Sequence, residues 1–335
     1  MSDPVLRVDD LRVGYRLGSE EVEIVAGVSF EVQPGEALGI AGESGCGKTT
    51  TALSILQLLA PGLERFSGTI DLATAAGVVH IHRRSERGMR DLRWSEVSLV
   101  FQGAQNALNP VQRISRQIGD AIRLHDPGCD RAAVRARVRE VLERVGISPD
   151  RADQFPHEFS GGMRQRVMIA LALACGPQLV IADEPTTALD VMTQAQVLAL
   201  LEELRRDLGL ALLLITHDLG VIAETCDRVA VMYAGKIVES GPTEAVFGLP
   251  QHPYTQRLLG AFPQIGGERL LPPAIPGSPP DPAEPPSGCR FHPRCHLSRE
   301  ACRHGEMVLR PVADDHDSAC LFAPLTKTPI SGGVQ

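Results

Sequence analysis

The feature that most constrains the fold of this 335-residue chain is the octapeptide Gly-Glu-Ser-Gly-Cys-Gly-Lys-Thr at residues 42–49. It matches the phosphate-loop pattern G-x-x-x-x-G-K-[ST] at every position. An apolar segment that we expect to be a strand, residues 37–41, precedes it, and a helical pattern over residues 50–59 follows it, which is the context that the motif requires. In such a loop, successive backbone N–H groups and the helix N-terminus face anionic oxygens. The segment therefore predicts a site for nucleotide phosphates.

Several side chains of this loop are candidate ligands. Lys48 can reach the β- and γ-phosphates, and the hydroxyl of Thr49 can coordinate Mg²⁺. Cys46 lies beside backbone N–H groups and a lysine, surroundings that favour a thiolate; an inert small side chain is the alternative. We expect eight residues here to contact the nucleotide: Gly42, Ser44, Gly45, Cys46, Gly47, Lys48, Thr49 and Thr50.

Composition and charge restrict the kinds of molecule that we expect this chain to bind. The net charge is −8 and there is no long basic run, so nucleic acid is not an expected partner. The first ten residues are charged and lack the apolar core of a signal peptide. No apolar segment is long enough to span a bilayer, so a membrane role needs separate membrane subunits. Without an export signal, we expect the eight cysteines to be reduced.

Apolar, β-branched segments alternate with helical patterns along the chain, which predicts an α/β fold with a mainly parallel sheet. A turn at residues 126–128 is expected to divide the helical stretch 114–145 into two helices. The expected strands are residues 6–13, 22–32, 68–81, 95–102, 179–183, 212–216, 228–233 and 236–240, and the other expected helices are 160–175 and 191–208.

Polar residues at the ends of expected strands are candidates for catalysis. The apolar segment 179–183 ends at Asp183, which can hold the Mg²⁺ shell, and Glu184 follows, where it can orient or deprotonate an attacking water. A surface acid pair that caps the next helix is the alternative. Gln102 ends another strand and can contact the metal or the water. His217 follows a third strand and can bond the γ-phosphate; an ordinary loop histidine is the alternative.

A glycine pair opens the helix expected after Phe159. Ser160 is its expected N-cap, and Gly161 and Gly162 allow an anion to approach the helix N-terminus closely. A plain capped helix start is the alternative for this segment.

The C-terminal part of the chain changes in composition. Residues 261–288 form an expected stiff linker, with eight prolines between residues 272 and 286. A cysteine-rich tail, residues 289–322, follows and is expected to be loop-like. Its four cysteines, Cys289, Cys295, Cys302 and Cys320, are spaced C-x₅-C-x₆-C-x₁₇-C. This spacing lacks the C-x₂₋₄-C of structural zinc, and it leaves open an iron–sulfur cluster, a mixed Cys/His zinc site with the nearby histidines, or reduced, unliganded thiols.

Taken in chain order, these features resemble the ATP-binding subunit of ABC transporters over roughly residues 4–260. The resemblance implies a P-loop NTPase nucleotide-binding domain with a RecA-like core, an antiparallel β subdomain and a helical subdomain at about 104–175, binding ATP and Mg²⁺. It implies that Tyr15 stacks on adenine. The family signature Leu-Ser-Gly-Gly-Gln stands here as Phe-Ser-Gly-Gly-Met at residues 159–163.

The resemblance narrows to the dipeptide/oligopeptide importer subfamily. The segments that carry it are Phe-Ser-Gly-Gly-Met-Arg-Gln-Arg at 159–166, Asn-Ala-Leu-Asn-Pro-Val at 106–111, Gln-His-Pro-Tyr-Thr at 251–255 and Gly-Cys-Arg-Phe-His-Pro-Arg-Cys at 288–295. The subfamily also includes importers of nickel, glutathione and some oligosaccharides. Some of its members carry a [4Fe–4S] cluster in the tail, which implies ligation by the four tail cysteines.

The same resemblance implies the assembly. Two ATP-binding subunits sandwich two nucleotides, with Ser160 and Gly162 of one completing the phosphate-loop site of the other. Because this chain has one loop and one signature, we expect a homologous ATP-binding subunit, two membrane permease subunits and an extracytoplasmic solute-binding protein as partners, at the cytoplasmic face of the cell membrane. A soluble ABC-type ATPase of DNA repair or translation is a remote alternative. A phosphate-loop kinase or GTPase would lack the signature, and the guanine-specifying Asn-Lys-x-Asp is absent.

Overall fold

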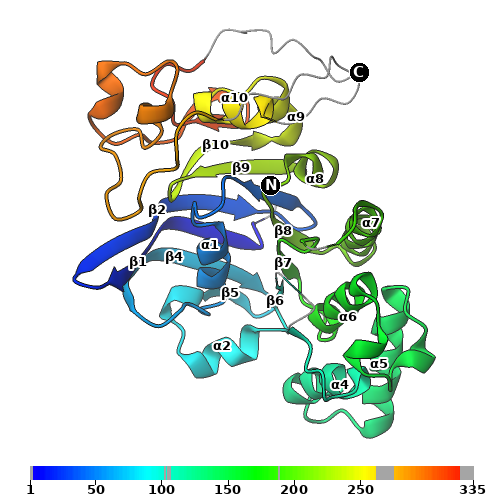
Figure 1. The fold of residues 1–335 in the computed structure, drawn as a ribbon. Helices are drawn as coiled ribbons and strands as arrows, with labels where there is room; N and C mark the ends of the chain where they lie inside the picture. Colours follow the sequence, from blue (N-terminus) through cyan, green and yellow to red (C-terminus); the bar gives the residue numbers. More distant parts are fainter. Residues whose placement is uncertain (1–2, 102, 104–106, 188, 262–274, 325–335) are drawn as a thin grey trace.

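The computed structural model describes residues 3–101, 103, 107–187, 189–261 and 275–324 (Figure 1). Its larger sheet has the strand order β11-β12-β10-β9-β3-β8-β7-β6, and its smaller sheet has the order β2-β1-β4-β5. The strands of the larger sheet are β3 (Ala37–Ala41), β6 (Val97–Val100), β7 (Leu179–Asp183), β8 (Ala211–Ile215), β9 (Arg228–Tyr233), β10 (Lys236–Pro242), β11 (Arg310–Ala313) and β12 (His316–Ser318). The two-sheet α/β architecture confirms the predicted fold class.

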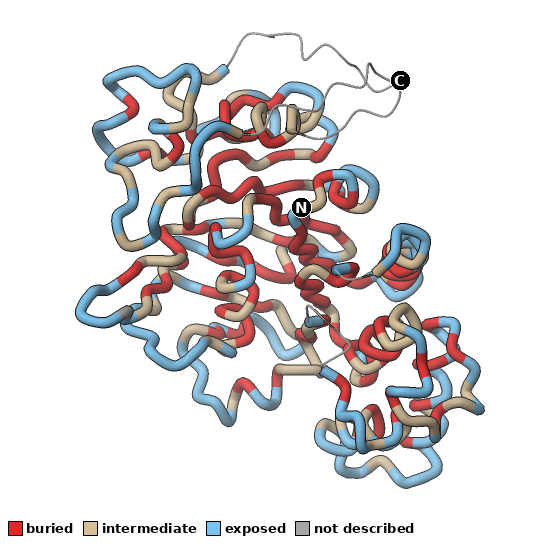
Figure 2. Tube along the Cα trace, viewed as in Figure 1, coloured by how far each residue is buried: buried red, intermediate tan, exposed pale blue. Residues whose placement is uncertain are grey.

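Every residue of β3, β7 and β8 is buried, and Figure 2 shows these strands in the buried centre of the molecule. They pair in parallel, with Ile40 and Asp183 both opposite Ile215 of β8. Strands covered on both faces need continuous apolar sequence, which these three have. Since parallel strands end at one edge of the sheet, the residues that follow β3, β7 and β8 meet there.

The smaller sheet is antiparallel and comprises β1 (Leu6–Leu17), β2 (Glu20–Val32), β4 (Leu63–Thr74) and β5 (Gly77–His80). Its inner face shares one hydrophobic core with the phosphate-loop helix α1 (Lys48–Ile55). The sequence predicted one strand region over residues 68–81, whereas the structure has β4 and β5 with a turn that ends at Gly77, whose φ of 112° suits glycine. Helix α1 is shorter than predicted and is followed by Gln57 at φ 50°.

Helices α4 (Ile114–His125), α5 (Arg131–Arg144) and α6 (Gly161–Leu173) pack on one another as a separate group, at the lower right of Figure 1. This arrangement confirms the predicted division of residues 114–145 into two helices. The remaining helices are α2 (Glu86–Leu92), α7 (Val191–Leu208), α8 (Leu219–Thr225), α9 (Thr243–Gly248) and α10 (Pro253–Gly260), with 3₁₀ turns at Ile81–Arg83, Pro149–Arg151, Pro156–Glu158, His292–Arg294 and Glu300–Arg303. Within the described ranges, no helix combines the length and apolar character that crossing a membrane requires.

The cysteine-rich tail was expected to be loop-like, but it also contributes two strands to the larger sheet. β12 pairs with β10, placing Ser318 opposite Glu239, and β11 pairs with β12. The Glu239 carboxylate is fully buried at this junction and accepts hydrogen bonds from the backbone N–H groups of Gln251 and His252 at 2.5 and 2.9 Å. It also bonds Nε2 of His316 at 2.8 Å. The tail is therefore joined to the ATPase sheet by buried polar contacts.

Candidate nucleotide site

The loop after β3 has the backbone geometry that phosphate binding needs. Gly45 and Gly47 have φ of 80° and 105°, in the region that glycine favours, and Gly47 is the N-cap of α1. A Cβ on Gly47 would lie 2.8 Å from the carbonyl oxygen of Ile24, so β2 lies against the loop. The loop and the helix start together form a backbone cradle for an anion.

Lys48 is buried, and its ammonium group is held inside the loop. Nζ donates to the carbonyl oxygens of Gly42 and Glu43 at 2.7 and 3.0 Å. These contacts hold the charge beside the cradle, where it can meet incoming phosphate oxygens.

Asp183 ends β7 beside the loop helix and is 5 % exposed. Burial raises the pKa of its carboxyl group, and the charge of Glu184 adds to this, while a hydrogen bond from Thr49 and the charge of Lys48 oppose it. Among the described residues, Oδ1 of Asp183 has no hydrogen-bond partner. A buried carboxylate oxygen beside a threonine hydroxyl is a donor set that suits Mg²⁺.

Glu184 adopts a φ of 46°, a strained backbone conformation of the kind that clusters at functional sites. Its Oε1 bonds Nδ1 of His217 at 3.0 Å, and its Oε2 accepts from the Thr187 hydroxyl at 2.8 Å. Burial alone would raise the pKa of Glu184, but the hydrogen bonds from His217 and Thr187 outweigh it and lower that pKa. The structure thus brings Asp183, Glu184 and His217 together beside the loop.

The predicted roles of two other residues, Gln102 and Tyr15, remain predictions. Gln102 lies outside the described residues, although β6, which precedes it, pairs with β7. Tyr15 lies on β1 opposite Val22 and packs, half-buried, against the hydrophobic core that contains Cys46. Tyr15 thus lies on the sheet beside the loop, and its stacking on adenine remains a prediction.

The predicted signature begins α6. The Ser160 hydroxyl accepts from the backbone N–H of Met163 at 3.4 Å, so Ser160 is the N-cap. A Cβ on Gly162 would lie 2.3 Å from Cγ2 of Thr193, so only glycine fits this close approach to α7. Figure 1 shows α6 well apart from α1, so the structure does not bring Ser160, Gly161 and Gly162 to this chain's own loop.

The expected thiolate at Cys46 is wrong. Cys46 is 5 % exposed, and burial raises the pKa of its thiol despite the nearby charge of Lys48. Inside the folded loop, the apolar environment outweighs the lysine that the sequence pattern emphasised.

Sequence reasoning missed the residues that hold the outer side of the loop. The Tyr254 hydroxyl accepts from the backbone N–H of Glu43 at 3.0 Å. Arg294 makes two bonds to the Glu43 carboxylate, at 2.7 and 3.1 Å. Both belong to segments that the sequence analysis used only as marks of a subfamily, and no spacing rule indicated that they reach the loop.

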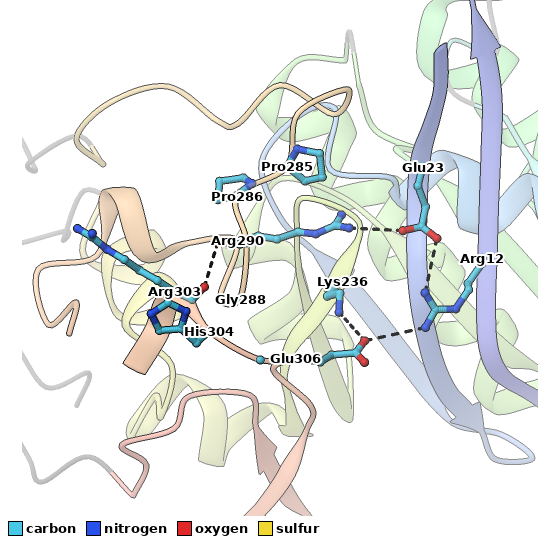
Figure 3. Close-up of a pocket in the computed structure, with 12 residues that line it drawn as sticks. Arg12, Glu23, Lys236, Pro285, Pro286, Gly288, Arg290, Arg303, His304 and Glu306 are labelled. Carbon is cyan, nitrogen blue, oxygen red and sulfur yellow. Dashed lines mark hydrogen bonds and ion pairs between the residues drawn. The ribbon is translucent and has the colours of Figure 1, made fainter. Parts of the chain in front are cut away.

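A charged network also joins the tail to the smaller sheet (Figure 3). Arg290 and Arg12 both contact the carboxylate of Glu23 at 3.5 Å. Lys236 donates to Glu306 at 2.9 Å. These residues line an open cleft of about 560 Å³. In addition, part of the proline-rich segment, from Pro279 to Pro285, lines a cavity of about 190 Å³ together with residues 43–46 of the loop.

The four tail cysteines all line one small cavity, of about 20 Å³, with Phe291 and Met307 among its other walls. Burial raises the pKa of the Cys289 thiol to about 11, and the charges of the other three cysteines contribute. Across the described ranges, no three His, Cys, Asp or Glu side chains are placed to hold one metal ion. The structure therefore gives no support to a zinc site in the tail.

A phosphate loop, two acids and a histidine on the edge of a parallel sheet, with a helical group and an antiparallel sheet beside it, define an ATP-binding cassette. The sequence profile of the ABC transporter family matches residues 25–187. The profile of the oligopeptide/dipeptide transporter C-terminal region matches residues 238–302.

The relatives agree with both matches. A Brucella abortus protein named as a peptide import ATP-binding protein is 46% identical over 331 residues, 95% of this chain and 97% of its own. A Sinorhizobium fredii protein named as a peptide ABC transporter ATP-binding protein is 45% identical over 95% of each chain. The chain therefore belongs to the ABC transporter family of ATP-binding proteins.

Solved structures show the same fold. The dimeric ATP-binding cassette MJ0796, in a post-hydrolysis state bound to ADP and Pi, aligns with a TM-score of 0.62 at 25% identity, covering 71% of this chain and 98% of that one. CbiO1 of Clostridium perfringens, part of an ABC transporter complex, also gives 0.62, at 29% identity, covering 74% and 92%.

Proposed function

We propose that this chain is the ATP-hydrolysing subunit of an ABC importer that powers the uptake of di- and oligopeptides through separate membrane subunits. The observation that carries the proposal is the match of residues 238–302 to the oligopeptide/dipeptide transporter C-terminal region in the same chain as a complete phosphate loop. The names of the relatives in Brucella and Sinorhizobium support the peptide substrate. Nickel, glutathione or oligosaccharide, which related importers carry, are the alternatives.

In the proposed reaction, Lys48 and the loop N–H groups bind the phosphates. Thr49 and Asp183, with Gln102 as a further ligand, would hold Mg²⁺, which would supply charge neutralisation at the β- and γ-phosphates. The unpartnered Oδ1 of Asp183 supports this assignment. Glu184 accepts the proton of the attacking water, and His217 orients Glu184 through the 3.0 Å bond and can contact the γ-phosphate.

The site is completed by a second subunit. Since α6 begins well apart from α1 in this chain, Ser160, Gly161 and Gly162 are available to the loop of a partner. We infer a heterodimer with a homologous ATP-binding subunit. Pull-down of the tagged chain from membranes should recover that homologue, and purified chain alone should be largely monomeric and a poor ATPase. A tight, fully active homodimer formed without ATP would contradict the heterodimer.

The membrane subunits are proposed to dock on the helical group. Residues of α4, α5 and the following 3₁₀ turn line a cleft of about 930 Å³. Arginine and aspartate residues make up most of its lining, among them Arg116, Arg139 and Asp150. We propose that this groove, which carries both signs of charge, receives a cytoplasmic helix of a permease subunit. In this proposal the chain acts at the cytoplasmic face of the membrane. An extracytoplasmic solute-binding protein would deliver the peptide.

Uptake of a labelled dipeptide by a strain that lacks this chain tests the whole proposal. The wild-type chain should restore uptake, and the Lys48→Ala variant, as a matched control, should not. Labelled nickel, glutathione and an oligosaccharide are measured in parallel. Restored uptake of one of these and not of the peptide would overturn the peptide assignment while leaving the transporter ATPase in place.

A [4Fe–4S] cluster in the tail is a second proposal. It is supported by the convergence on one cavity of four soft thiols that lie up to 31 residues apart in the sequence, Cys289 to Cys320. A cluster distributes its four ligands over separate irons, so it does not need three side chains around one ion. The cavity would have to widen, because about 20 Å³ is room for little more than a water molecule.

Anaerobic purification with iron and sulfide analysis tests the cluster. We expect about four irons per chain and a brown colour, both lost in Cys295→Ser, while ATP binding is kept. A colourless wild-type protein without iron would overturn the cluster and leave the ATPase proposal untouched.

A further inference from the structure

We propose that Arg294, in the cysteine-rich tail, is a positioning residue of the nucleotide site that neutralises the acidic side chain of the phosphate loop. The inference deepens the proposed ATPase function and rests on it. Glu43 is the second residue of the loop, and Arg294 binds both of its carboxylate oxygens, at 2.7 and 3.1 Å. A two-bond arginine–carboxylate pair fixes the orientation of the acid as well as its charge.

The pair is held in a defined place. The Arg294 side chain is 6 % exposed, and Glu43 is 24 % exposed. Arg294 also donates to the Tyr233 hydroxyl at 3.2 Å and to the carbonyl oxygen of Pro276 at 2.9 Å. Its guanidinium lies 6.0 Å from the ring centre of Phe291. Partners on three segments fix the guanidinium, so it can act as a stationary charge beside the loop.

Aromatic packing joins the same tail segment to the loop. The rings of Tyr233, Tyr254 and Phe291 pack pairwise, with centroids 4.5 to 5.3 Å apart, and all three side chains are fully buried. Tyr254 in turn accepts the backbone N–H of Glu43 at 3.0 Å. The Glu43 N–H therefore points outward to α10 and the carboxylate outward to the tail.

The electrostatic need for Arg294 follows from the ligand. ATP brings several negative charges to the loop, and Glu43 is a negative charge in that loop. Its field reaches the interior, because it contributes to the raised pKa of Cys46. Lys48 donates to the carbonyl oxygen of Glu43 and not to its carboxylate. Without Arg294, an uncompensated carboxylate would repel the phosphates and compete for the lysine.

A purely structural role makes a different prediction. If Arg294 only fastens the tail, then removing Glu43 as well cannot repair the damage. If Arg294 cancels charge, then removing the carboxylate repairs it. Arg290 provides the matched control, since it fastens the same segment through Glu23 at 3.5 Å and the carbonyl oxygen of Ala234 but does not bind the Glu43 carboxylate.

The test measures Mg-ATP binding by titration calorimetry on the full-length chain, with thermal unfolding to confirm folding. Arg294→Met keeps the aliphatic volume and removes the charge; it should weaken binding roughly tenfold. Glu43→Gln should bind as tightly as wild type or a few-fold more tightly. The double variant should recover to within about threefold of wild type, and Arg290→Met should stay within about twofold of it.

The outcomes distinguish charge neutralisation by Arg294 from a purely structural role of this residue. Unchanged affinity in Arg294→Met, or a double variant as weak as the single one, would overturn the charge role while leaving the ATPase assignment standing. Should Arg294→Met not fold, Glu43→Gln decides alone, since a clear loss of affinity there would overturn the proposal. A wild-type chain that binds no Mg-ATP would remove the proposed function and this inference with it.

Discussion

Replacing Glu184 by glutamine tests the assignment of the catalytic base with little change of shape. The carboxylate accepts from His217 at 3.0 Å and from Thr187 at 2.8 Å. A glutamine amide has one acceptor oxygen, so it can keep one of these bonds, but it cannot take a proton from water. Phosphate binding through Lys48 is untouched, so Mg-ATP affinity should stay within about twofold of wild type.

The expected loss of turnover rate can be estimated from the role of Glu184 as a general base. General-base catalysis contributes about 10²–10⁴-fold, which corresponds to about 2.7–5.5 kcal/mol of the activation barrier. His217 and Thr187 lower the pKa of Glu184, which makes it a weaker base. We therefore expect a loss near the lower end, about 10²-fold in kcat.

The assay is ATP hydrolysis by the assembled transporter. Glu86→Gln is the control, because Glu86 is an exposed acid that is distant from Glu184 in the sequence. The base acts only when deprotonated. Because the pKa of Glu184 lies below its ordinary value of 4.5, the group is ionised throughout the neutral range, and its titration should not reduce kcat between about pH 6 and 8. Wild-type turnover in Glu184→Gln, or a loss of rate near pH 6.5 that this variant abolishes, would refute the reasoning.

Three further outcomes are expected. Lys48→Ala should abolish measurable Mg-ATP binding and turnover in equilibrium and rate assays, because it removes the only ammonium donor described inside the loop. Residual hydrolysis within tenfold of wild type would count against this role of Lys48. Cys46 should be alkylated at least about tenfold more slowly than the half-exposed Cys129, because burial raises its pKa; mass mapping that finds equal rates would contradict this. Glu239→Ala should lower the unfolding free energy by about 3–5 kcal/mol, since two buried N–H groups and His316 lose their acceptor. The denaturation midpoint should not move in the control Glu300→Ala. An equally small change in both variants would show that the buried contacts of Glu239 do not stabilise the protein.

Where the chemistry is local, the sequence was enough. The loop at residues 42–49 must be glycine-rich and must end in lysine and threonine, because backbone N–H groups, an ammonium and a hydroxyl are what phosphate and Mg²⁺ require. The buried parallel strands show as continuous apolar segments, and the acids Asp183 and Glu184 follow one of them. Spacing along the chain therefore predicted the strand edge at which the structure assembles them.

Only the tertiary structure decided what surrounds that loop. The sequence suggested a reactive Cys46 because a lysine lies two residues away, but the pKa depends on burial by distant strands. Arg294 lies 251 residues beyond Glu43, and a pair so far apart leaves no periodic pattern in a single sequence. The pairing of β12 with β10 likewise depends on a sheet edge that forms only when the chain folds. Contacts between distant segments are set by packing and burial, so local sequence patterns could not predict that the cysteine-rich tail closes against the nucleotide site.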